Sequence, residues 1–374
     1  MVHWLGDREG NISAPILPNY SQYVISYDAF NGVYQYGKSK GVITTTISAE
    51  VQKVALEALG DYKGTVAIYN YRTGELICAV STPTFDPDFI PEISENDPDG
   101  LDGIYLNRFT QATYVPGSIF KIVTLAAALE NIPDIQERTF SCSGKLTFGT
   151  DEVTCMSVHN SQSLKTAFRN SCNCVFAQIA LELGAETLDR CIKQFGITEP
   201  VNIDGLVTSA GNVEVLNAAS VNLAWSAIGQ HKDQINPCAY LTFVGAIAND
   251  GVCVSPYFVQ QAAIGGDVTY TASTPPGKRI MNASTAKILQ EYMGYNVTNN
   301  YGSNNFPGLT VCAKTGTAEV GGDKKPNATF TGFAADEEYP LAFIICIENA
   351  GSGKAICIPI VSKILEACKT ALGS

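Results

Sequence analysis

The sequence predicts an α/β chain of the α+β type, with a five-stranded antiparallel sheet flanked by helices and an inserted, mostly helical region. Two β-rich runs around a polar turn lie in residues 64–83, and three more lie in residues 309–350. Helical periods dominate residues 171–251 between them. Because the strand-forming runs stand at both ends, we expect the two ends of the chain to combine into one sheet.

Two units follow from the change of pattern along the chain. Residues 1–44 are rich in Gly, Asn, Tyr and Ser without a strong period, and we interpret them as an N-terminal arm. A helix that Ser48 can cap and Gly60 can end then opens a domain over residues 45–374. An amphipathic helix over residues 358–373 closes this domain.

Charge and hydropathy exclude several classes of protein. The 374 residues carry 24 basic and 36 acidic side chains, and the net charge of −12 argues against a nucleic acid or an anionic membrane surface as partner. No apolar run reaches the roughly 18 residues that a membrane span needs. We therefore expect this chain to be soluble, while a longer parent protein could still have carried an anchor.

A helix over residues 114–130 carries one polar stripe on an otherwise apolar surface. The stripe consists of Ser118, Lys121 and Thr124. Burial of a lysine favours its neutral form, so Lys121 can act as a base toward Ser118, three residues earlier on the same face. A helix start also offers free backbone N–H groups to a developing negative charge. The pattern predicts an activated serine nucleophile.

The same Ser-x-x-Lys spacing recurs at Ser284 and Lys287. We interpret Ser284 as the N-cap of a helix and Lys287 as part of a solvated helix face. This second pair is therefore not expected to be catalytic.

The run Lys314-Thr315-Gly316-Thr317 ends a β-branched, apolar segment. Its lysine and threonines can line the edge of a strand, and Gly316 can let a ligand backbone approach closely. Such an edge suits the addition of a peptide substrate as a further strand. The similar Arg72-Thr73-Gly74 falls in a turn and is expected to be structural.

Ser171-Cys172-Asn173 stands directly before a buried helix, where both polar side chains can point into a cleft. The Ser-x-Asn triplet itself is common here, since it also begins at Ser94, Ser220 and Ser303. Those three fall in an acidic loop, in a helical pattern and in a Gly/Asn loop. Only the triplet at Ser171 has the turn-then-helix setting of a site.

Most of the twelve cysteines lie in apolar runs and are expected to be small buried hydrophobes. Cys142 and Cys155 differ, because they flank a stretch that reads as a hairpin. A disulfide between them and two free thiols are both open, and a metal site with His159 is a weaker alternative because no second close ligand pair is visible.

Taken in order, these motifs resemble those of penicillin-binding proteins and serine β-lactamases. The wider similarity is to class B penicillin-binding proteins, whose transpeptidase domains resemble residues 45–374 almost throughout. Gly229-Gln230-His231 departs from the usual Gly-Gln-Gly, so the loop there is expected to differ. The motif residues that carry the resemblance are Ser118, Lys121, Ser171, Asn173, Lys314, Thr315 and Gly316.

The resemblance implies acyl transfer on a peptidoglycan stem peptide that ends in D-Ala-D-Ala. Lys121 would take the proton of Ser118, and the backbone N–H groups of Ser118 and Thr317 would form the oxyanion hole. Ser171 would relay a proton to the leaving D-Ala, and Asn173 would orient Lys121 and the substrate amide.

The remaining motif residues would bind the substrate. Lys314, Thr315 and Thr317 would hold the terminal carboxylate of the stem peptide. β-Lactam antibiotics would acylate the same serine. The reaction would need no metal ion and no organic cofactor.

The resemblance also implies a place for the native protein. It would work at the extracytoplasmic face of the bacterial plasma membrane and contact other cell-wall synthesis proteins through an N-terminal region that this chain lacks. Two alternatives remain at this stage. One is a serine β-lactamase that uses Glu199, and the other is a non-catalytic β-lactam sensor or scaffold.

Overall fold

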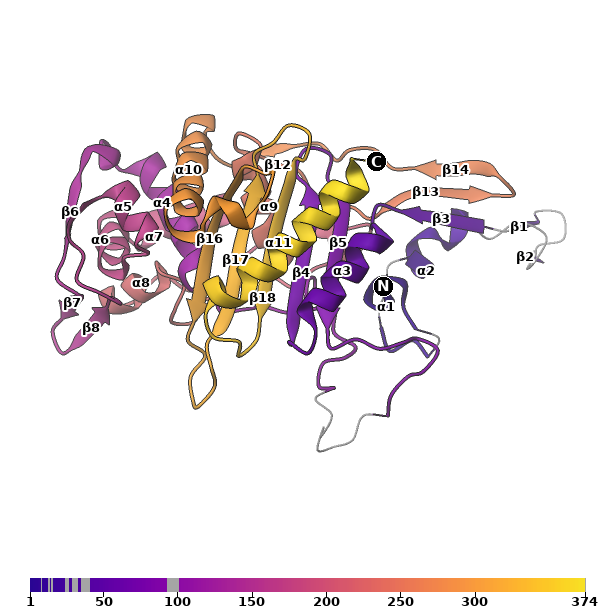
Figure 1. Cartoon of the computed structure of the whole chain (residues 1–374), viewed down its shortest axis with the longest axis horizontal. Coiled ribbons are helices and arrows are strands. Elements are labelled where there is room, and N and C mark those ends of the chain that lie inside the picture. The colour runs from indigo at the N-terminus through magenta and orange to yellow at the C-terminus, as the bar shows by residue number, and fades with distance from the viewer. Residues whose placement is uncertain are drawn as a thin grey trace.

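In the computed structural model of the chain, five antiparallel strands form a central sheet, as the sequence predicts (Figure 1). The structure describes residues 1–23 except 8, 13 and 15, the pairs 27–28 and 33–34, and residues 41–92 and 101–373. The strands follow the order β16, β17, β18, β4 and β5. Their bounds are β4 Gly64–Asn70, β5 Leu76–Thr82, β16 Val311–Ala318, β17 Asn327–Ala334 and β18 Leu341–Ile347.

The C-terminal strands of this sheet therefore pair with its N-terminal strands, because β18 lies beside β4 with Ile345 opposite Val66. Strand β16 forms one edge of the sheet and pairs with β17, where Thr331 lies opposite Lys314. This edge places the Lys-Thr-Gly run beside the helical region.

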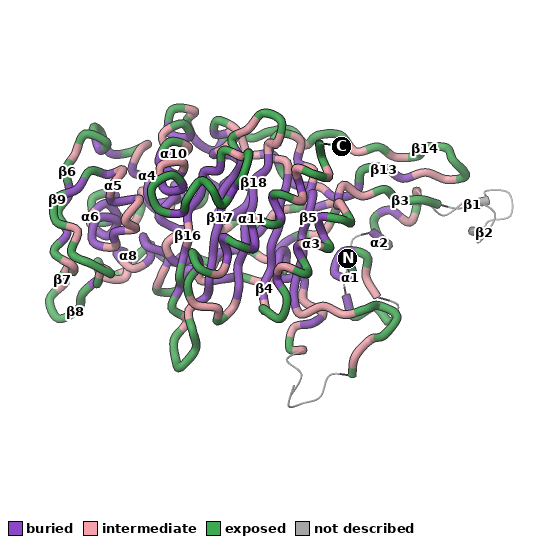
Figure 2. Tube along the Cα trace, in the orientation of Figure 1, coloured by how far each residue is buried: buried purple, intermediate pink, exposed green. Residues whose placement is uncertain are grey.

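Helices cover both faces of the sheet, which explains why β17 and β18 are buried along their whole length (Figure 2). Helices α3 (Ala49–Leu59) and α11 (Gly353–Leu372) cover one face, and α9 (Pro237–Ala248) packs on the other. Alternate residues of a strand point to opposite faces. Phe343 accordingly belongs to the hydrophobic cluster on the α11 side, and Ile344 to the cluster on the α9 side.

The chain between β5 and β16 forms the helical region that the sequence predicts. Its helices are α4 Lys121–Asn131, α5 Leu164–Arg169, α6 Asn173–Leu183, α7 Ala185–Gln194, α8 Ser220–Ser226, α9 and α10 Ala283–Asn296. Its shorter helical turns are η2 Gly117–Phe120, η3 Ile135–Glu137, η4 Val297–Tyr301 and η5 Ser303–Asn305.

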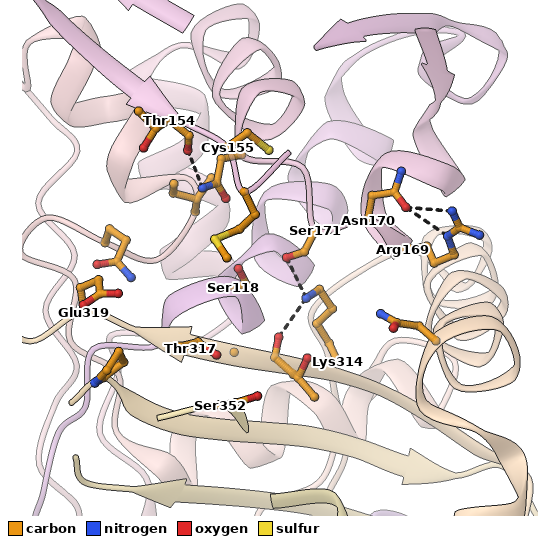
Figure 3. A pocket seen from close by; sticks show the side chains of 18 of the residues that line it. Ser118, Thr154, Cys155, Arg169, Asn170, Ser171, Lys314, Thr317, Glu319 and Ser352 are labelled. Atoms are coloured by element: carbon orange, nitrogen blue, oxygen red, sulfur yellow. Dashed lines mark hydrogen bonds between the residues drawn. The ribbon is translucent and has the colours of Figure 1, made fainter. Parts of the chain in front are cut away.

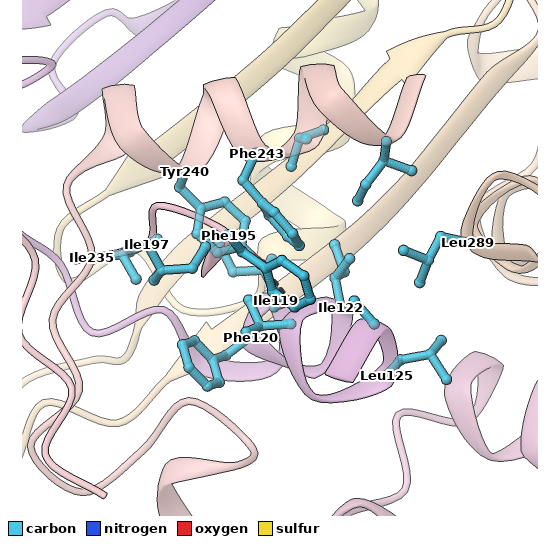
Figure 4. Packing of buried hydrophobic residues seen from close by; sticks show 14 of the residues in the cluster. Ile119, Phe120, Ile122, Leu125, Phe195, Ile197, Ile235, Tyr240, Phe243 and Leu289 are labelled. Carbon is cyan, nitrogen blue, oxygen red and sulfur yellow. Dashed lines mark hydrogen bonds between the residues drawn. The ribbon is translucent and has the colours of Figure 1, made fainter. Parts of the chain in front are cut away.

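The core of this region surrounds the start of α4 (Figure 4). Ile119 and Ile122 face Tyr240 and Phe243 of α9, and Leu289 of α10 closes one end of the cluster. The Tyr240 hydroxyl donates a 2.7 Å hydrogen bond to the carbonyl of Ile119. This packing fixes the helix start from which the motif serine projects.

Small sheets lie around the helical region and at the far end of the molecule (Figure 1). The two-stranded sheet β6–β9 and the hairpin β7–β8 lie beside the helical region, and β3, β13 and β14 form a three-stranded sheet at the other end. Their bounds are β3 Gly41–Thr45, β6 Thr139–Cys142, β7 Lys145–Phe148, β8 Asp151–Thr154, β9 Asn160–Ser163, β13 Val259–Ile264 and β14 Asp267–Thr271. The two-residue strands are β1 Tyr27–Asp28, β2 Val33–Tyr34, β10 Asn202–Ile203, β11 Leu206–Val207, β12 Val252–Cys253 and β15 Lys278–Arg279.

The first residues of the chain pack against the sheet domain. They form the short helix α1 (Val2–Leu5), and α2 (Ile16–Tyr20) and η1 (Ser21–Tyr23) follow. Trp4 is buried and donates a 2.9 Å hydrogen bond from its indole N–H to the carbonyl of Ala79 in β5. No helix among the described residues is both long and apolar enough to cross a bilayer.

Local predictions of helix ends are mostly confirmed. Ser48 caps α3 by accepting from the N–H of Val51, and Gly60 follows its last turn. The prediction for Ser284 is wrong, because Asn282 occupies the N-cap of α10 and Ser284 lies inside the first turn. Lys287 is exposed, as predicted. Ser94 lies outside the described residues.

Candidate active site

A cleft of about 1250 Å³ opens where the edge strand β16 meets the helical region (Figure 3). Its lining includes Ser118, Ser171, Asn173, Lys314, Thr315, Gly316 and Thr317, so all three sequence motifs contribute to one site. Lys121 lies beneath this surface and is fully buried. The structure thus brings together every residue that the sequence analysis assigned to the site.

Ser118 lies in the helical turn η2, which continues directly into α4. Gly117 has a φ of 58°, in the left-handed region, and its N–H donates a 2.9 Å hydrogen bond to the carbonyl of Gly229. A Cβ at Gly117 would lie 2.8 Å from the carbonyl oxygen of Thr317. Glycine is therefore needed here for the start of the helix to touch the edge of the sheet.

The amine of Lys121 contacts four oxygen atoms. Its Nζ lies 2.7 Å from the Ser171 carbonyl and 2.7 Å from Oδ1 of Asn173, both of which can only accept hydrogen bonds. It also lies 3.0 Å from Oγ of Ser118 and 3.1 Å from Oγ of Ser171. A neutral amine has two N–H donors for the two carbonyl oxygens, and one lone pair is then left for a hydroxyl proton of a serine.

Burial favours this neutral form. No part of the Lys121 side chain is exposed, and burial lowers its pKa to about 7, although the negative charge of nearby cysteine thiolates would act in the opposite direction. The surroundings thus favour loss of the charge near neutral pH. Lys121 has the geometry and the pKa of a general base for Ser118.

Ser171 links the two lysines. Its Oγ lies 3.0 Å from Nζ of Lys314 as well as 3.1 Å from Nζ of Lys121. Its φ of 52° is unusual for a residue other than glycine and turns the chain into α6, whose N-cap is Cys172. The next residue, Asn173, donates from Nδ2 to the carbonyl of Thr154 at 2.8 Å.

Lys314 lies in β16 with only 1% of its surface exposed. Its Nζ lies 2.9 Å from the carbonyl of Thr315. Burial, and secondly the nearby charge of Lys121, hold the pKa of Lys314 well below its usual range. A carboxylate that entered the cleft would raise this pKa again and so favour the charged form of Lys314.

The edge of β16 presents backbone N–H groups to the cleft. The N–H of Thr315 donates a 3.0 Å hydrogen bond to the Tyr301 hydroxyl, which shows that this residue directs its backbone away from β17. The N–H groups of a strand alternate in direction, so that of Thr317 lies on the same side. Thr317 lies beside the Ser118 turn, because a Cβ at Gly117 would be only 2.8 Å from the Thr317 carbonyl oxygen. An oxyanion hole formed with the N–H of Ser118 requires this proximity.

The expectation for Gly316 needs correction. A Cβ at this position would run into Oγ1 of Thr329 and lie 2.7 Å from the carbonyl of Pro116. Glycine is thus required for contact between two parts of the protein itself, and not for the approach of a ligand backbone. Gly316 still lines the cleft.

Tyr301 is a site residue that the sequence analysis missed. It lines the cleft and accepts hydrogen bonds from both the N–H and Oγ1 of Thr315. It ends η4, a π-helical turn that continues α10. The sequence pattern of a π-helical turn does not differ visibly from that of an ordinary helix end.

Gln230 and His231 line the cleft, so the departure from Gly-Gln-Gly falls within the wall of the site. The other candidates lie outside it. Glu199 is exposed and does not line the cleft. Of the described residues that do line it, Glu319 is the only carboxylate, and it is exposed.

The predicted hairpin between Cys142 and Cys155 is confirmed as β7–β8, but both cysteines are free thiols and no disulfide joins them. With His159 and Cys172 they form a cluster beside the cleft in which the possible metal-binding atoms lie within 4.8 Å of one another. Cys172 was not among the residues predicted for a metal site from the sequence.

The sequence model of the penicillin binding protein transpeptidase domain matches residues 64–366. A relative from Mycolicibacterium smegmatis, the peptidoglycan D,D-transpeptidase PbpA, is 29% identical over 354 residues, which are 86% of this chain and 71% of the relative. Stage V sporulation protein D of Bacillus subtilis is 28% identical over 353 residues, which are 88% of this chain and 53% of that protein.

Solved structures agree with the sequence relatives. Penicillin-binding protein A from M. tuberculosis, as its penicillin G acyl-enzyme complex, superposes with a TM-score of 0.83 at 25% identity over 98% of this chain and 91% of that one. A D,D-transpeptidase domain from Eggerthella lenta superposes with a TM-score of 0.82 at 26% identity, over 99% and 92% of the two chains.

Proposed function

The chain belongs to the penicillin-binding protein transpeptidase family, and we propose that it is a peptidoglycan D,D-transpeptidase that cross-links stem peptides through an acyl-enzyme on Ser118. The observation that carries this assignment is the fully buried Lys121, whose amine lies 3.0 Å from the Ser118 hydroxyl. A base in contact with a serine at the start of a helix is the arrangement that nucleophilic acyl transfer needs.

In the first step, Lys121 takes the proton of Ser118 as the serine oxygen attacks the penultimate D-Ala carbonyl. The N–H groups of Ser118 and Thr317 bind the oxyanion, and each such donor commonly contributes ~3 kcal/mol. The bond to the terminal D-Ala then breaks. The proton reaches the leaving amine through Ser171, which lies within 3.1 Å of Lys121.

Lys314, Thr315 and Thr317 hold the terminal carboxylate of the donor peptide during this step. Asn173 keeps Lys121 oriented through its 2.7 Å contact and offers its amide to the substrate. An amine from a neighbouring stem peptide then attacks the acyl-enzyme, which forms the cross-link and frees Ser118. β-Lactams enter the same route and remain bound as esters of Ser118.

A β-lactamase is the alternative with the same motifs, but it needs a group that activates a deacylating water. Neither the exposed Glu199, outside the cleft, nor the exposed Glu319 offers a buried carboxylate beside Ser118. This supports slow deacylation and hence a transpeptidase.

Intact mass spectrometry after incubation with penicillin tests the assignment. We expect one adduct that persists for hours and maps to Ser118, and none in Ser118→Ala. Ser284→Ala, which removes the serine of the second Ser-x-x-Lys pair, is the matched control and should be acylated like the wild type. Rapid loss of the drug without an adduct would instead identify a β-lactamase, and covalent binding to Ser118→Ala would refute the role of Ser118.

The organisation of the native protein forms part of the proposal. Residues 45–374 are assigned to the transpeptidase domain and residues 1–44 to an arm that leads to it. Since peptidoglycan lies outside the plasma membrane, the domain would work at the extracytoplasmic face. Contacts with other cell-wall synthesis proteins would then involve regions N-terminal to the domain.

A further inference from the structure

Three cysteines and one histidine from separate elements meet beside the cleft. Cys142 ends β6, Cys155 follows β8, His159 precedes β9, and Cys172 is the N-cap of α6. Cys142 and Cys172 are buried, whereas Cys155 and His159 are half-buried. Their sulfur and imidazole nitrogen atoms all lie within 4.8 Å of one another.

Three of the distances between these atoms match those of a tetrahedral zinc site. With Zn–S near ~2.3 Å and Zn–N near ~2.05 Å, tetrahedral angles separate two sulfurs by about 3.8 Å and a sulfur from a nitrogen by about 3.5 Å. Nδ1 of His159 lies 3.6 Å from Sγ of Cys142 and 3.5 Å from Sγ of Cys155. Sγ of Cys155 lies 3.9 Å from Sγ of Cys172.

A disulfide and hydrophobic packing both account for the cluster less well than a metal ion does. A disulfide needs two sulfurs at about 2.05 Å, well below the 3.9 Å between Cys155 and Cys172, and it would leave a third thiol and an imidazole beside it. Hydrophobic packing accounts for cysteines inside apolar helices and strands, such as Cys346 and Cys357, which are completely buried. It gives no reason for three sulfurs to converge on one imidazole at the wall of a cleft.

We propose that Cys142, Cys155, His159 and Cys172 bind one Zn²⁺ as a closed, structural site. Three thiolates and one neutral imidazole form a donor set that zinc prefers over harder cations such as Mg²⁺ or Ca²⁺. On binding, each thiol loses its proton to solvent, and three Zn–S bonds and one Zn–N bond form without any change of oxidation state. Four protein ligands leave no position for a substrate.

The ion would position the catalytic motif. Cys172 stands between Ser171 and Asn173, so a bond from its sulfur to zinc would anchor the turn that carries both side chains. The 2.8 Å hydrogen bond from Asn173 to Thr154 joins the same motif to the residue before Cys155. Cys155 and Ser171 lie on the wall of the cleft opposite Thr317 (Figure 3). The bound zinc ion would stabilise this wall of the cleft from the side that faces the protein interior.

Metal analysis of the whole chain tests the site. Protein purified under reducing conditions and given Zn²⁺ should retain about one zinc per chain after gel filtration. Cys155→Ser and Cys172→Ser should each weaken zinc binding at least about tenfold. Cys253→Ser, which changes another half-buried cysteine far from the cluster in sequence, is the matched control and should retain the metal. Equal zinc content in wild type and Cys155→Ser would overturn the proposal.

Cobalt gives a test that needs no variant. Addition of Co²⁺ to the metal-free wild-type protein should produce sulfur-to-cobalt charge-transfer absorption in the near ultraviolet and the visible bands of a tetrahedral ion, and Zn²⁺ should abolish both. Absence of these bands in folded, reduced protein would refute the site. Peptide mapping of protein prepared without reductant would show whether Cys155 and Cys172 form a disulfide. Such a disulfide would also refute the site if zinc failed to bind after the disulfide was reduced.

The positioning role rests on the proposed function and has its own readout. Removal of zinc by a chelator should lower the rate of penicillin acylation by at least about tenfold, and added Zn²⁺ should restore it. If zinc binds but its removal leaves acylation unchanged, the positioning role is refuted while the site stands. If neither form is acylated, the proposed function fails independently of the metal content.

Discussion

The protonation state of Lys121 should control the rate of acylation. Its pKa is lowered by burial to about 7, and only the neutral amine can accept the Ser118 proton. The neutral fraction is then about one tenth at pH 6 and about nine tenths at pH 8. The second-order rate constant for a fluorescent penicillin should therefore rise about tenfold per pH unit at low pH and level off above pH ~7.

Stopped-flow measurement between pH 5 and 8, with thermal unfolding recorded at each pH, separates this effect from loss of the fold. Lys287→Ala removes the exposed lysine of the second Ser-x-x-Lys pair and should leave the midpoint unchanged. Lys121→Ala should lower the rate by about 10²–10⁴-fold, the usual contribution of a general base. A wild-type rate that stayed constant across this range, or that fell as pH rose, would refute the reasoning about Lys121.

Three further predictions concern other parts of the site and its support. Gly117→Ala should reduce acylation by more than about tenfold and destabilise the fold, because its Cβ meets a backbone carbonyl of β16 at 2.8 Å. Gly149→Ala, at a similar φ of 65° in open space, should cost only about 1 kcal/mol in urea unfolding and spare acylation. Tyr301→Phe removes the acceptor of the Thr315 N–H and should cost about 1–3 kcal/mol of unfolding free energy, and an unchanged urea midpoint would contradict this. Burial raises the pKa of Asp233 well above its usual range, so the folded carboxyl keeps a proton that the unfolded chain releases above pH ~4. The contribution of Asp233 to stability should therefore fall as pH rises above ~4, whereas burial lowers the pKa of His3 to about 4, which acts in the opposite direction up to pH ~6.5. Asp233→Asn should accordingly gain stability relative to the wild type as pH rises from 4 to 8, and an unchanged difference across this range would refute the assignment.

The sheet and the motifs could be predicted because they depend on local patterns. Apolar β-branched runs marked the strands, and a lysine in an apolar helix marked Lys121 as unusual. The tertiary contacts of the site were not predictable in this way. Tyr301 contacts Thr315 through a π-helical turn that has no sequence signature, and the role of Gly316 depends on Pro116, 200 positions earlier. The proximity of Cys172 to the other cysteines depends on the packing of four separate elements, which no local sequence pattern shows.

Direct backbone contact between the sheet and the start of α4 has a consequence for the evolution of drug resistance. Side chains at Gly117 or Gly316 would meet main-chain atoms, which cannot move aside as a flexible side chain can. Substitutions at Gly117 or Gly316 would therefore abolish the transpeptidase reaction together with the sensitivity to β-lactams. Variants selected by β-lactams should therefore accumulate at the rim, at positions such as Trp225, Gln230 and Glu319, where side chains line the cleft and a change can distinguish an antibiotic from a peptide.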